Sequence, residues 1–243
     1  MVLTVYPGRS SEGTRTMAEC GDGSAGEVLM QFHNLGETCE FGFAQRAIGI
    51  EPLHLFRFIG LHEPSGNRLE RMVAGLAVGF SGLGEPEDIR LIPLPEWNIV
   101  CFSETRYGLF GHTGIRINQE PAEKTRADLV IKLRLLLRKF HEDLATGEKI
   151  FIWQASVPLP ERKVRYLFDT LREFGPNQMV WLPPRDERAP SAKVDMIADG
   201  LVRATKTRKP ALGDLDPLTA AEWVSICRQS LKILRGSAAS API

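Results

Sequence analysis

AEKTRADLVIKLRLLLRKFHEDLATGEKIFIWQ, residues 122–154, joins a long amphipathic pattern to a short apolar run. Apolar side chains recur in it at helical spacing, namely at Leu129, Val130, Leu133, Leu136, Leu137, Phe140 and Leu144. This spacing gives one broad apolar stripe and predicts a helix over 122–146. Pro121 precedes the pattern and Gly147 follows it, which is the usual placement of these two residues at helix ends. KIFIWQ (149–154) then predicts a buried strand.

The same alternation continues toward the C-terminus. A helix is predicted over 161–174 and a strand over QMVWLP (178–183). A strand, a helix and a second apolar strand in this order indicate a crossover connection within a parallel sheet. The charged and proline-rich stretch 184–218 predicts a loop with one short strand near Gly200–Ala204, and a final helix is predicted at about 219–234.

Strands and helices also alternate before residue 122. VLMQFHNL (28–35) and LHLFRFI (53–59) have the apolar patterns of strands, and helices are predicted at about 37–48 and at 67–80, the second capped by Asn67. Three further strands, 89–94, 97–104 and 107–117, follow one another through turns and resemble a β-hairpin.

The predicted fold class is therefore α/β. We expect a three-layer open sheet, largely parallel, with helices on both faces and a β-hairpin-like segment around 89–117. Residues 27–235 are predicted to form a single α/β domain, which suits the length of 243 residues. Residues 1–26 lack apolar periodicity and predict a disordered lead-in, and residues 236–243 (GSAASAPI) predict a frayed tail.

Composition and charge argue against several classes of function. Thirty basic residues balance thirty acidic ones, so the net charge is +0 and gives no field that would attract nucleic acid. No window approaches 18 uninterrupted apolar residues, so we expect no membrane span. The N-terminus lacks the basic start and apolar stretch of a secretory signal, and we expect a cytoplasmic protein.

The four cysteines, Cys20, Cys39, Cys101 and Cys227, show no paired spacing. A disulfide framework needs a shorter and more cysteine-rich chain, and a structural zinc site needs ligands paired closely in sequence. The sequence therefore predicts free thiols, no metal and no cofactor.

Cys39 stands where a nucleophile would be expected in an α/β fold. It follows a predicted strand and the turn at Gly36, and it lies in the first turn of a predicted helix at the carboxyl edge of the sheet. The partial positive charge and unpaired amides of a helix start favour a thiolate and an oxyanion. Asn34, Gly36 and the first helical amides would line an oxyanion site, with Thr38 and Glu40 in supporting positions. The alternative is a small cysteine packed in the core.

A cysteine nucleophile requires a base, which is usually histidine. Among the five histidines, His112 is surrounded by three glycines in GLFGHTGI, which permit a close approach of the backbone to a site. His33 lies inside a predicted strand and is expected in the core. His54 and His62 bracket LHLFRFIGLH and would replace His112 if either stood nearer the thiol.

The stretch NLGETCEFGFAQRAIGIEPLHLFRF resembles a bacterial family of unknown function whose members are described as papain-like cysteine peptidases. The matching pieces are Asn34-Leu35-Gly36-Glu37-Thr38-Cys39, the segment YGLFGHTGI with His112, and LRLLLRKFHEDLATGEKIFIW. The resemblance spans about residues 28–183. It implies Cys39 as nucleophile and His112 as base. It also implies a helical lobe facing an antiparallel barrel, whereas the periodicity predicts a parallel sheet. The strand–turn–nucleophile–helix arrangement also resembles that of small serine esterases with an α/β/α sandwich, with cysteine in place of serine.

Two classes of function follow from these residues. The first is a cysteine-dependent hydrolase or acyl-transfer enzyme that uses Cys39 and His112 on a small-molecule or peptide substrate. The second is a non-catalytic binding or scaffolding domain with a buried structural cysteine. The third member of a triad stays open between four residues, Asn118, Asp143, Asn177 and Asp195.

Overall fold

The computed structural model describes residues 23–61, 67–186, 188, 190, 192–208 and 217–238. The α-helices are α1 (Ala25–Leu29), α2 (Glu40–Ala47), α3 (Arg68–Ala77), α4 (Ala122–Thr146), α5 (Glu161–Arg172) and α6 (Pro217–Ala238). The strands are β1 (Phe32–Asn34), β2 (Ile59–Leu61), β3 (Ile89–Leu94), β4 (Ile99–Glu104), β5 (Leu109–Arg116), β6 (Ile150–Gln154), β7 (Gln178–Leu182), β8 (Val194–Ala198) and β9 (Leu201–Ala204).

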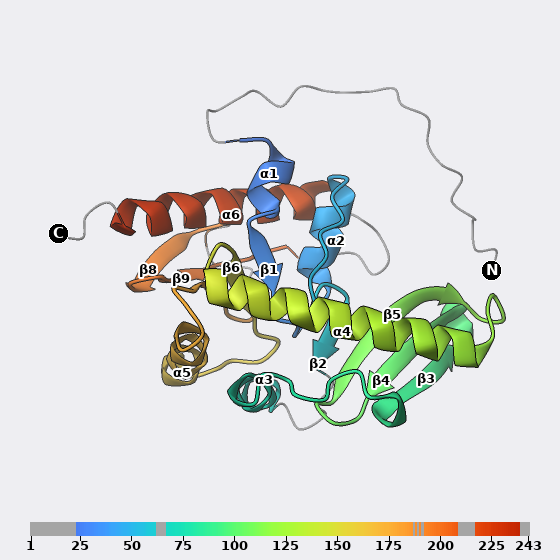
Figure 1. Ribbon diagram of the computed structural model, residues 1–243. Coiled ribbons are helices and arrows are strands. Elements are labelled where there is room, and N and C mark those ends of the chain that lie inside the picture. The colour runs from blue at the N-terminus through green and yellow to red at the C-terminus, as the bar shows by residue number, and fades with distance from the viewer. Residues whose placement is uncertain are drawn as a thin grey trace.

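The larger sheet has five strands in the order β1-β6-β7-β9-β8 (Figure 1). The first four run parallel, with Phe32 opposite Ile150 and Ile150 opposite Gln178. Only β8 is antiparallel to its neighbour β9. The predicted mixed α/β class and the largely parallel sheet are confirmed.

A second sheet contains the segment that the sequence predicts as hairpin-like. It has four antiparallel strands in the order β2-β5-β4-β3. The three strands predicted over 89–117 are present as β3, β4 and β5, and β2 extends them on one side. The prediction of one sheet was therefore incomplete, because the sequence does not show that this segment pairs with residues 59–61 rather than with the parallel strands.

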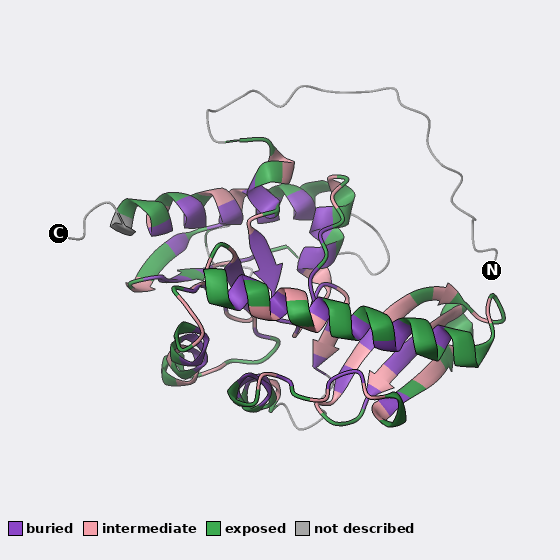
Figure 2. Ribbon diagram, viewed as in Figure 1, coloured by how far each residue is buried: buried purple, intermediate pink, exposed green. Residues whose placement is uncertain are grey.

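Side chains of the five-stranded sheet alternate between two apolar clusters, as expected where both faces are covered. In Figure 2, strand β1 and stretches of α4 and α6 are coloured as buried. One cluster joins Phe151, Trp153 and Met179 to residues of α3, α4 and α5. The other joins Ile152 and Val180 to residues of α1, α2 and α6. Successive residues of one strand thus contribute to opposite clusters.

Helix α4 has the bounds that the sequence predicts. Pro121 is its N-cap. Gly147 ends the helix with a left-handed φ of 64°, and its backbone amide donates a hydrogen bond to the Asp143 carbonyl at 3.1 Å. Its buried leucines share one cluster with Phe102 of the smaller sheet and Phe151 of the larger one. Helix α4 therefore connects the two sheets, as Figure 1 shows.

Two predicted strands are placed differently in the structure. Residues 28 and 29 belong to α1, because Ser24 and Glu27 form a reciprocal capping box that starts a helix there, and only Phe32–Asn34 is strand. The stretch 53–58 is irregular, and its apolar alternation reflects the burial of Leu55 and Phe56 in a loop. Strand β2 begins at Ile59.

The strand and the helix predicted in the C-terminal part of the chain are present, together with one strand, β8, that was not predicted. The short strand predicted near Gly200–Ala204 is β9, and β8 precedes it to form a hairpin through Gly200, whose φ is +76°. Helix α6 extends to Ala238, beyond the end predicted at about residue 234. Residues 1–22 and 239–243, which hold most of the predicted lead-in and tail, lie outside the described residues.

Two leucines on opposite faces of α4 test this packing. Leu133 is 0% exposed and Leu135 is 44% exposed. We expect Leu133→Ala to lower the free energy of unfolding by about 2–5 kcal/mol, because it leaves a cavity under the helix. Leu135→Ala, the matched control, should change it by about 0.5 kcal/mol or less. Urea denaturation measures both, and equal losses would contradict the assignment of the buried face.

Candidate functional site

Cys39 is the N-cap residue of α2 and follows the loop that leaves β1. The loop turns at Gly36, which has a φ of +80°. A Cβ atom at this position would lie 2.6 Å from Phe56 Cδ1 and 2.9 Å from the Ile59 carbonyl oxygen. Only glycine fits this turn, and the role of Gly36 is therefore to let the loop before Cys39 adopt this conformation.

Asn34 holds the loop from inside. Its side-chain Nδ2 donates to the Thr38 carbonyl at 2.6 Å and to the Phe56 carbonyl at 3.0 Å. Both amide hydrogens are thus used within the protein. This arrangement makes Asn34 a positioning residue for Cys39 and leaves it no hydrogen to donate to an oxyanion, in contrast to the role that the sequence suggests.

Thr38 and Glu40 direct their side chains toward the parallel sheet. Thr38 Oγ1 donates to Gln154 Oε1 at 2.7 Å, and Gln154 Nε2 donates to Glu40 Oε2 at 3.0 Å. The other carboxylate oxygen of Glu40 accepts from Trp223 Nε1 at 3.1 Å and lies 2.5 Å from Lys206 Nζ. The ammonium group of Lys206 and the indole of Trp223 in α6 therefore hold the Glu40 carboxylate in place.

Glu222 completes this group, which we call the buried ion network (Glu40, Lys206 and Glu222). Lys206 Nζ lies 3.9 Å from Glu222 Oε2, and the Lys206 and Glu222 side chains are 3% and 2% exposed. The Glu222 carboxylate also accepts from the amides of Thr207 at 2.9 Å and Arg208 at 3.1 Å. The network occupies the carboxyl ends of β1, β6 and β9, where an open crevice would be expected in a fold of this class.

Glu37, the other acid beside Cys39, also has partners away from the thiol. Its Oε1 accepts from the Ser156 amide at 2.8 Å and from Arg68 Nη1 at 3.4 Å. Neither Glu37 nor Glu40 acts on the ionisation of Cys39.

The thiol of Cys39 is protonated near neutral pH. Burial, together with the nearby thiol of Cys101, raises the pKa of Cys39 to about 11. The amides of Glu40, Phe41 and Gly42, which start α2, have no hydrogen-bond acceptor among the described residues. The start of the helix can thus receive an anion, although burial keeps the free thiol neutral.

Cys101 and His112 form a direct contact on the smaller sheet. They lie opposite each other on β4 and β5, beside the bulge between Val100 and Cys101, and Cys101 Sγ lies 3.5 Å from His112 Nδ1. Cys101 is fully buried, whereas His112 is partly exposed. Burial raises the pKa of Cys101 and lowers the pKa of His112, so a neutral thiol faces a neutral imidazole.

Cys101 and His112 are therefore in direct contact, and Cys39 lies in the neighbourhood of Cys101. Cys101 contacts His112 and lies close enough to Cys39 to affect its pKa. In the part of the chain that the structure describes, no hydrogen bond joins Cys39 to His112 directly. The sequence did not identify Cys101, although the antiparallel pairing predicted for 97–104 and 107–117 already places it near His112.

Two other histidines form a separate buried group. The rings of His33 and His54 stack with centroids 4.4 Å apart. His33 Nδ1 lies 3.0 Å from Asp143 Oδ2, and His54 Nε2 lies 3.4 Å from Gln45 Oε1. Burial lowers the pKa of both rings. These are core residues, as the sequence indicates for His33, while His62 lies outside the described residues.

The four residues considered as a third triad member are engaged elsewhere or lie in turns. Asp143 pairs with His33, and Asp195 pairs with Lys193. Asn177 Nδ2 donates to the carbonyls of Leu144 and Leu171, and Asn118 occupies a turn with a φ of 62°. Within the described residues His112 has no carboxylate or amide partner, and Cys101 takes that place.

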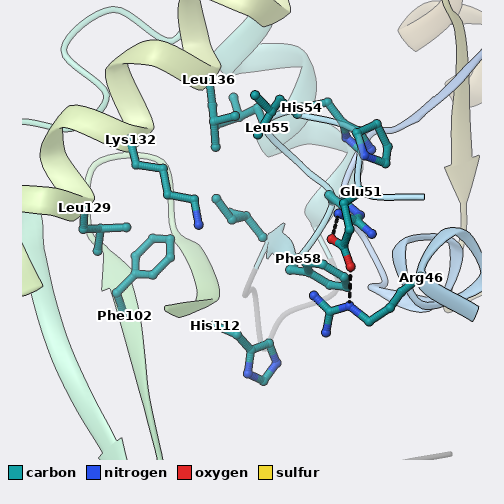
Figure 3. Close-up of a pocket in the computed structure, with 14 residues that line it drawn as sticks. Arg46, Glu51, His54, Leu55, Phe58, Phe102, His112, Leu129, Lys132 and Leu136 are labelled. Carbon is teal, nitrogen blue, oxygen red and sulfur yellow. Dashed lines mark hydrogen bonds and ion pairs between the residues drawn. The ribbon is translucent and has the colours of Figure 1, made fainter. Parts of the chain in front are cut away.

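Two cavities flank these groups. The first, of about 240 Å³, lies between α4, residues 46–59 and His112 (Figure 3). The second, of about 420 Å³, lies at the ends of β7 and β9 and is lined by Trp181, Pro183, Arg203 and Lys206 among others. Only the first contains a member of the group of Cys39, Cys101 and His112.

Comparison with protein-family models, with curated proteins and with solved structures finds no match for this chain. Within the described residues no helix is both long and apolar enough to cross a membrane. In the same part of the chain, no three histidine, cysteine or acidic side chains are grouped to hold a metal ion.

The buried ion network gives a direct stability test. Lys206→Met leaves the carboxylates of Glu40 and Glu222 without their buried cation, and we expect the free energy of unfolding to fall by about 3–5 kcal/mol. Lys193→Met is the control, because Lys193 pairs with Asp195 on the surface, where a pair contributes about 1 kcal/mol or less. Equal effects of the two substitutions in urea denaturation would contradict the network.

Proposed function

We propose that the protein is a cysteine-dependent hydrolase or acyl-transfer enzyme with Cys39 as nucleophile and His112 as general base. The observation that carries the proposal is the grouping of Cys39, at the start of a helix, with the Cys101–His112 pair of the smaller sheet. A thiol, a base and free helix-start amides are the parts that acyl transfer requires.

The chemistry begins with the attack of Cys39 Sγ on the carbonyl carbon of an acyl substrate. The thiol proton passes to Nε2 of His112, because Nδ1 faces Cys101. The histidine then protonates the leaving group as the carbon–leaving group bond breaks, which gives an S-acyl cysteine and a neutral base. Water or a second acceptor attacks this thioester in the same way and restores the thiol.

The pKa values favour general-base catalysis over a preformed ion pair. With a pKa of about 11, Cys39 is a thiol before the reaction, and His112 is neutral because burial lowers its pKa. A neutral imidazole can accept the proton during attack. Cys101 then serves as a positioning residue that holds the ring through Nδ1, since its own thiol is fully buried.

The oxyanion formed during attack would bind at the start of α2. The amides of Glu40, Phe41 and Gly42 have no described acceptor, and the helix dipole favours a negative charge there. Gly36 and Asn34 support this site by fixing the loop, and Thr38 and Glu40 do so by anchoring the helix to the parallel sheet.

The second candidate function is a non-catalytic binding or scaffolding domain. It is favoured by the raised pKa of Cys39, which makes the free thiol a weak nucleophile. In this case the cysteine serves packing, and the cavity beside His112 is the functional feature.

We also propose how the layers of the fold are arranged and where in the cell the protein is found. We infer that the helices on the two clusters form three layers around the parallel sheet, as in small serine esterases, within one domain over 27–235. A cytoplasmic location suits the free thiols that the sequence predicts.

Turnover of p-nitrophenyl esters and short acyl thioesters tests the enzymatic proposal. We expect Cys39→Ala to abolish turnover and His112→Gln to lower kcat/KM by about 10²- to 10⁴-fold, because the general base is lost. The rate should fall only at a pH below 6.5, since His112 must be neutral and burial lowers its pKa from that value.

Cys227→Ala is the control, because it removes a buried thiol of α6 that has no part in the proposed chemistry. It should retain turnover, and circular dichroism should show that all variants are folded. Full activity in Cys39→Ala, or no turnover of any acyl compound by the native chain, would favour the binding domain instead.

A further inference from the structure

The cavity of about 240 Å³ next to His112 is built from three parts of the chain: residues 46–59, α4 and the smaller sheet. Its volume lies below the range of about 300–1,000 Å³ that is usual for drug-sized ligands. A short organic molecule fits, whereas a folded peptide segment does not.

Positive charge is concentrated around this cavity. Among the described residues, its lining includes the cations Arg46, Arg57 and Lys132 and one acid, Glu51. His54 and His112 add no charge near neutral pH, because burial lowers the pKa of both. The described part of the lining therefore carries three cations and one acid, a net charge of +2, in a chain whose total is +0.

Arg46 is held in place by two contacts that leave its outer edge available. Its Nε donates to Glu51 at 2.9 Å, and its Cζ lies 4.4 Å from the ring centroid of Phe58. Figure 3 shows its two terminal nitrogens on the side that faces His112, and no described residue bonds to them. A guanidinium edge of this kind can bind a carboxylate or phosphate through two parallel hydrogen bonds.

Arg57 stabilises this arrangement from the inside. Its side chain is 8% exposed, pairs with Glu51, donates to the Ile50 carbonyl at 2.9 Å and stacks on Phe58 at 4.7 Å. Glu51 is thus shared between two arginines and cannot neutralise both. One positive charge of the Arg46–Arg57 pair is therefore not neutralised by Glu51 and can attract an anionic ligand.

Lys132 provides the opposite side. Figure 3 shows its side chain extending from α4 past Phe102 toward the space that separates Phe102 from Phe58. Among the described residues its ammonium group has no ion-pair or hydrogen-bond partner. Leu129 and Leu136 lie on either side of it along the helix, and with Phe102 they form an apolar wall.

We propose that this cavity binds a small organic oxyanion whose carboxylate or phosphate group lies between Arg46 and Lys132 and whose short apolar chain packs on Phe102, Leu129 and Leu136. Insofar as the proposed function holds, the bound molecule is the acid portion of the substrate, because His112 lines the same cavity. The enzyme would then act on acyl compounds that carry a second, anionic group.

Binding is measured by isothermal titration calorimetry on the Cys39→Ala chain, so that the result does not depend on catalysis. Hexanoate and n-butyl phosphate are the probes, and hexanamide is the uncharged counterpart of hexanoate. We expect at least one oxyanion to bind and hexanamide to bind about tenfold more weakly or not at all, since it lacks the charge-assisted hydrogen bonds. The preferred oxyanion identifies the head group as carboxylate or phosphate.

Arg46→Gln and Lys132→Met should each weaken oxyanion binding by about tenfold. Arg138→Gln is the control on the same helix, because Arg138 is 72% exposed and does not line the cavity. Equal binding of hexanoate and hexanamide, no effect of either cavity substitution, or no oxyanion binding would overturn the inference. Oxyanion binding by a chain that shows no Cys39-dependent turnover would reject the proposed function and retain this site.

Discussion

The ion pair between Glu40 and Lys206 is the interaction on which the arrangement of the site depends. It joins the first residue of α2 to the segment after β9, and Gln154 and Trp223 extend the connection to β6 and α6. Charges buried to this extent are tolerated only when they are paired and hydrogen-bonded. The start of α2, and with it Cys39, therefore has one position relative to the parallel sheet.

Helix α4 sets the position of the remaining groups. The helix packs on the parallel sheet through Phe140, whose ring centroid lies 5.9 Å from that of Phe151, and it contacts strand β3 of the smaller sheet. The smaller sheet carries Cys101 and His112, while the side of α4 near Lys132 closes the cationic cavity. The histidine and the cavity wall thus come from different elements, which meet because one helix packs against the smaller sheet as well as the larger one.

Local patterns in the sequence predicted the elements whose periodicity is strong. Helix α4 and strand β6 follow from leucine spacing and from one apolar run, and β3, β4 and β5 follow from alternation between turns. The apolar run 28–35 predicted a single strand, whereas the capping box of Ser24 and Glu27 starts α1 within that run. Pairing of β2 with β5 and of Glu40 with Lys206 joins segments distant in sequence, and no local pattern reports it. For the site, the sequence proposed Cys39 and His112. It did not single out Cys101, which contacts His112 across the β4–β5 pairing, or Arg46, which pairs with Glu51 and stacks on Phe58.

The central claim is that Cys39 forms a covalent acyl intermediate. Mass spectrometry of peptides from the native chain, quenched in acid after brief exposure to an activated aryl ester, tests it most directly. The acyl group should appear on the peptide that contains Cys39, and it should be absent when His112 is replaced by glutamine. An acyl group on Cys101 or Cys227, or unmodified Cys39 after complete consumption of the ester, would contradict the claim.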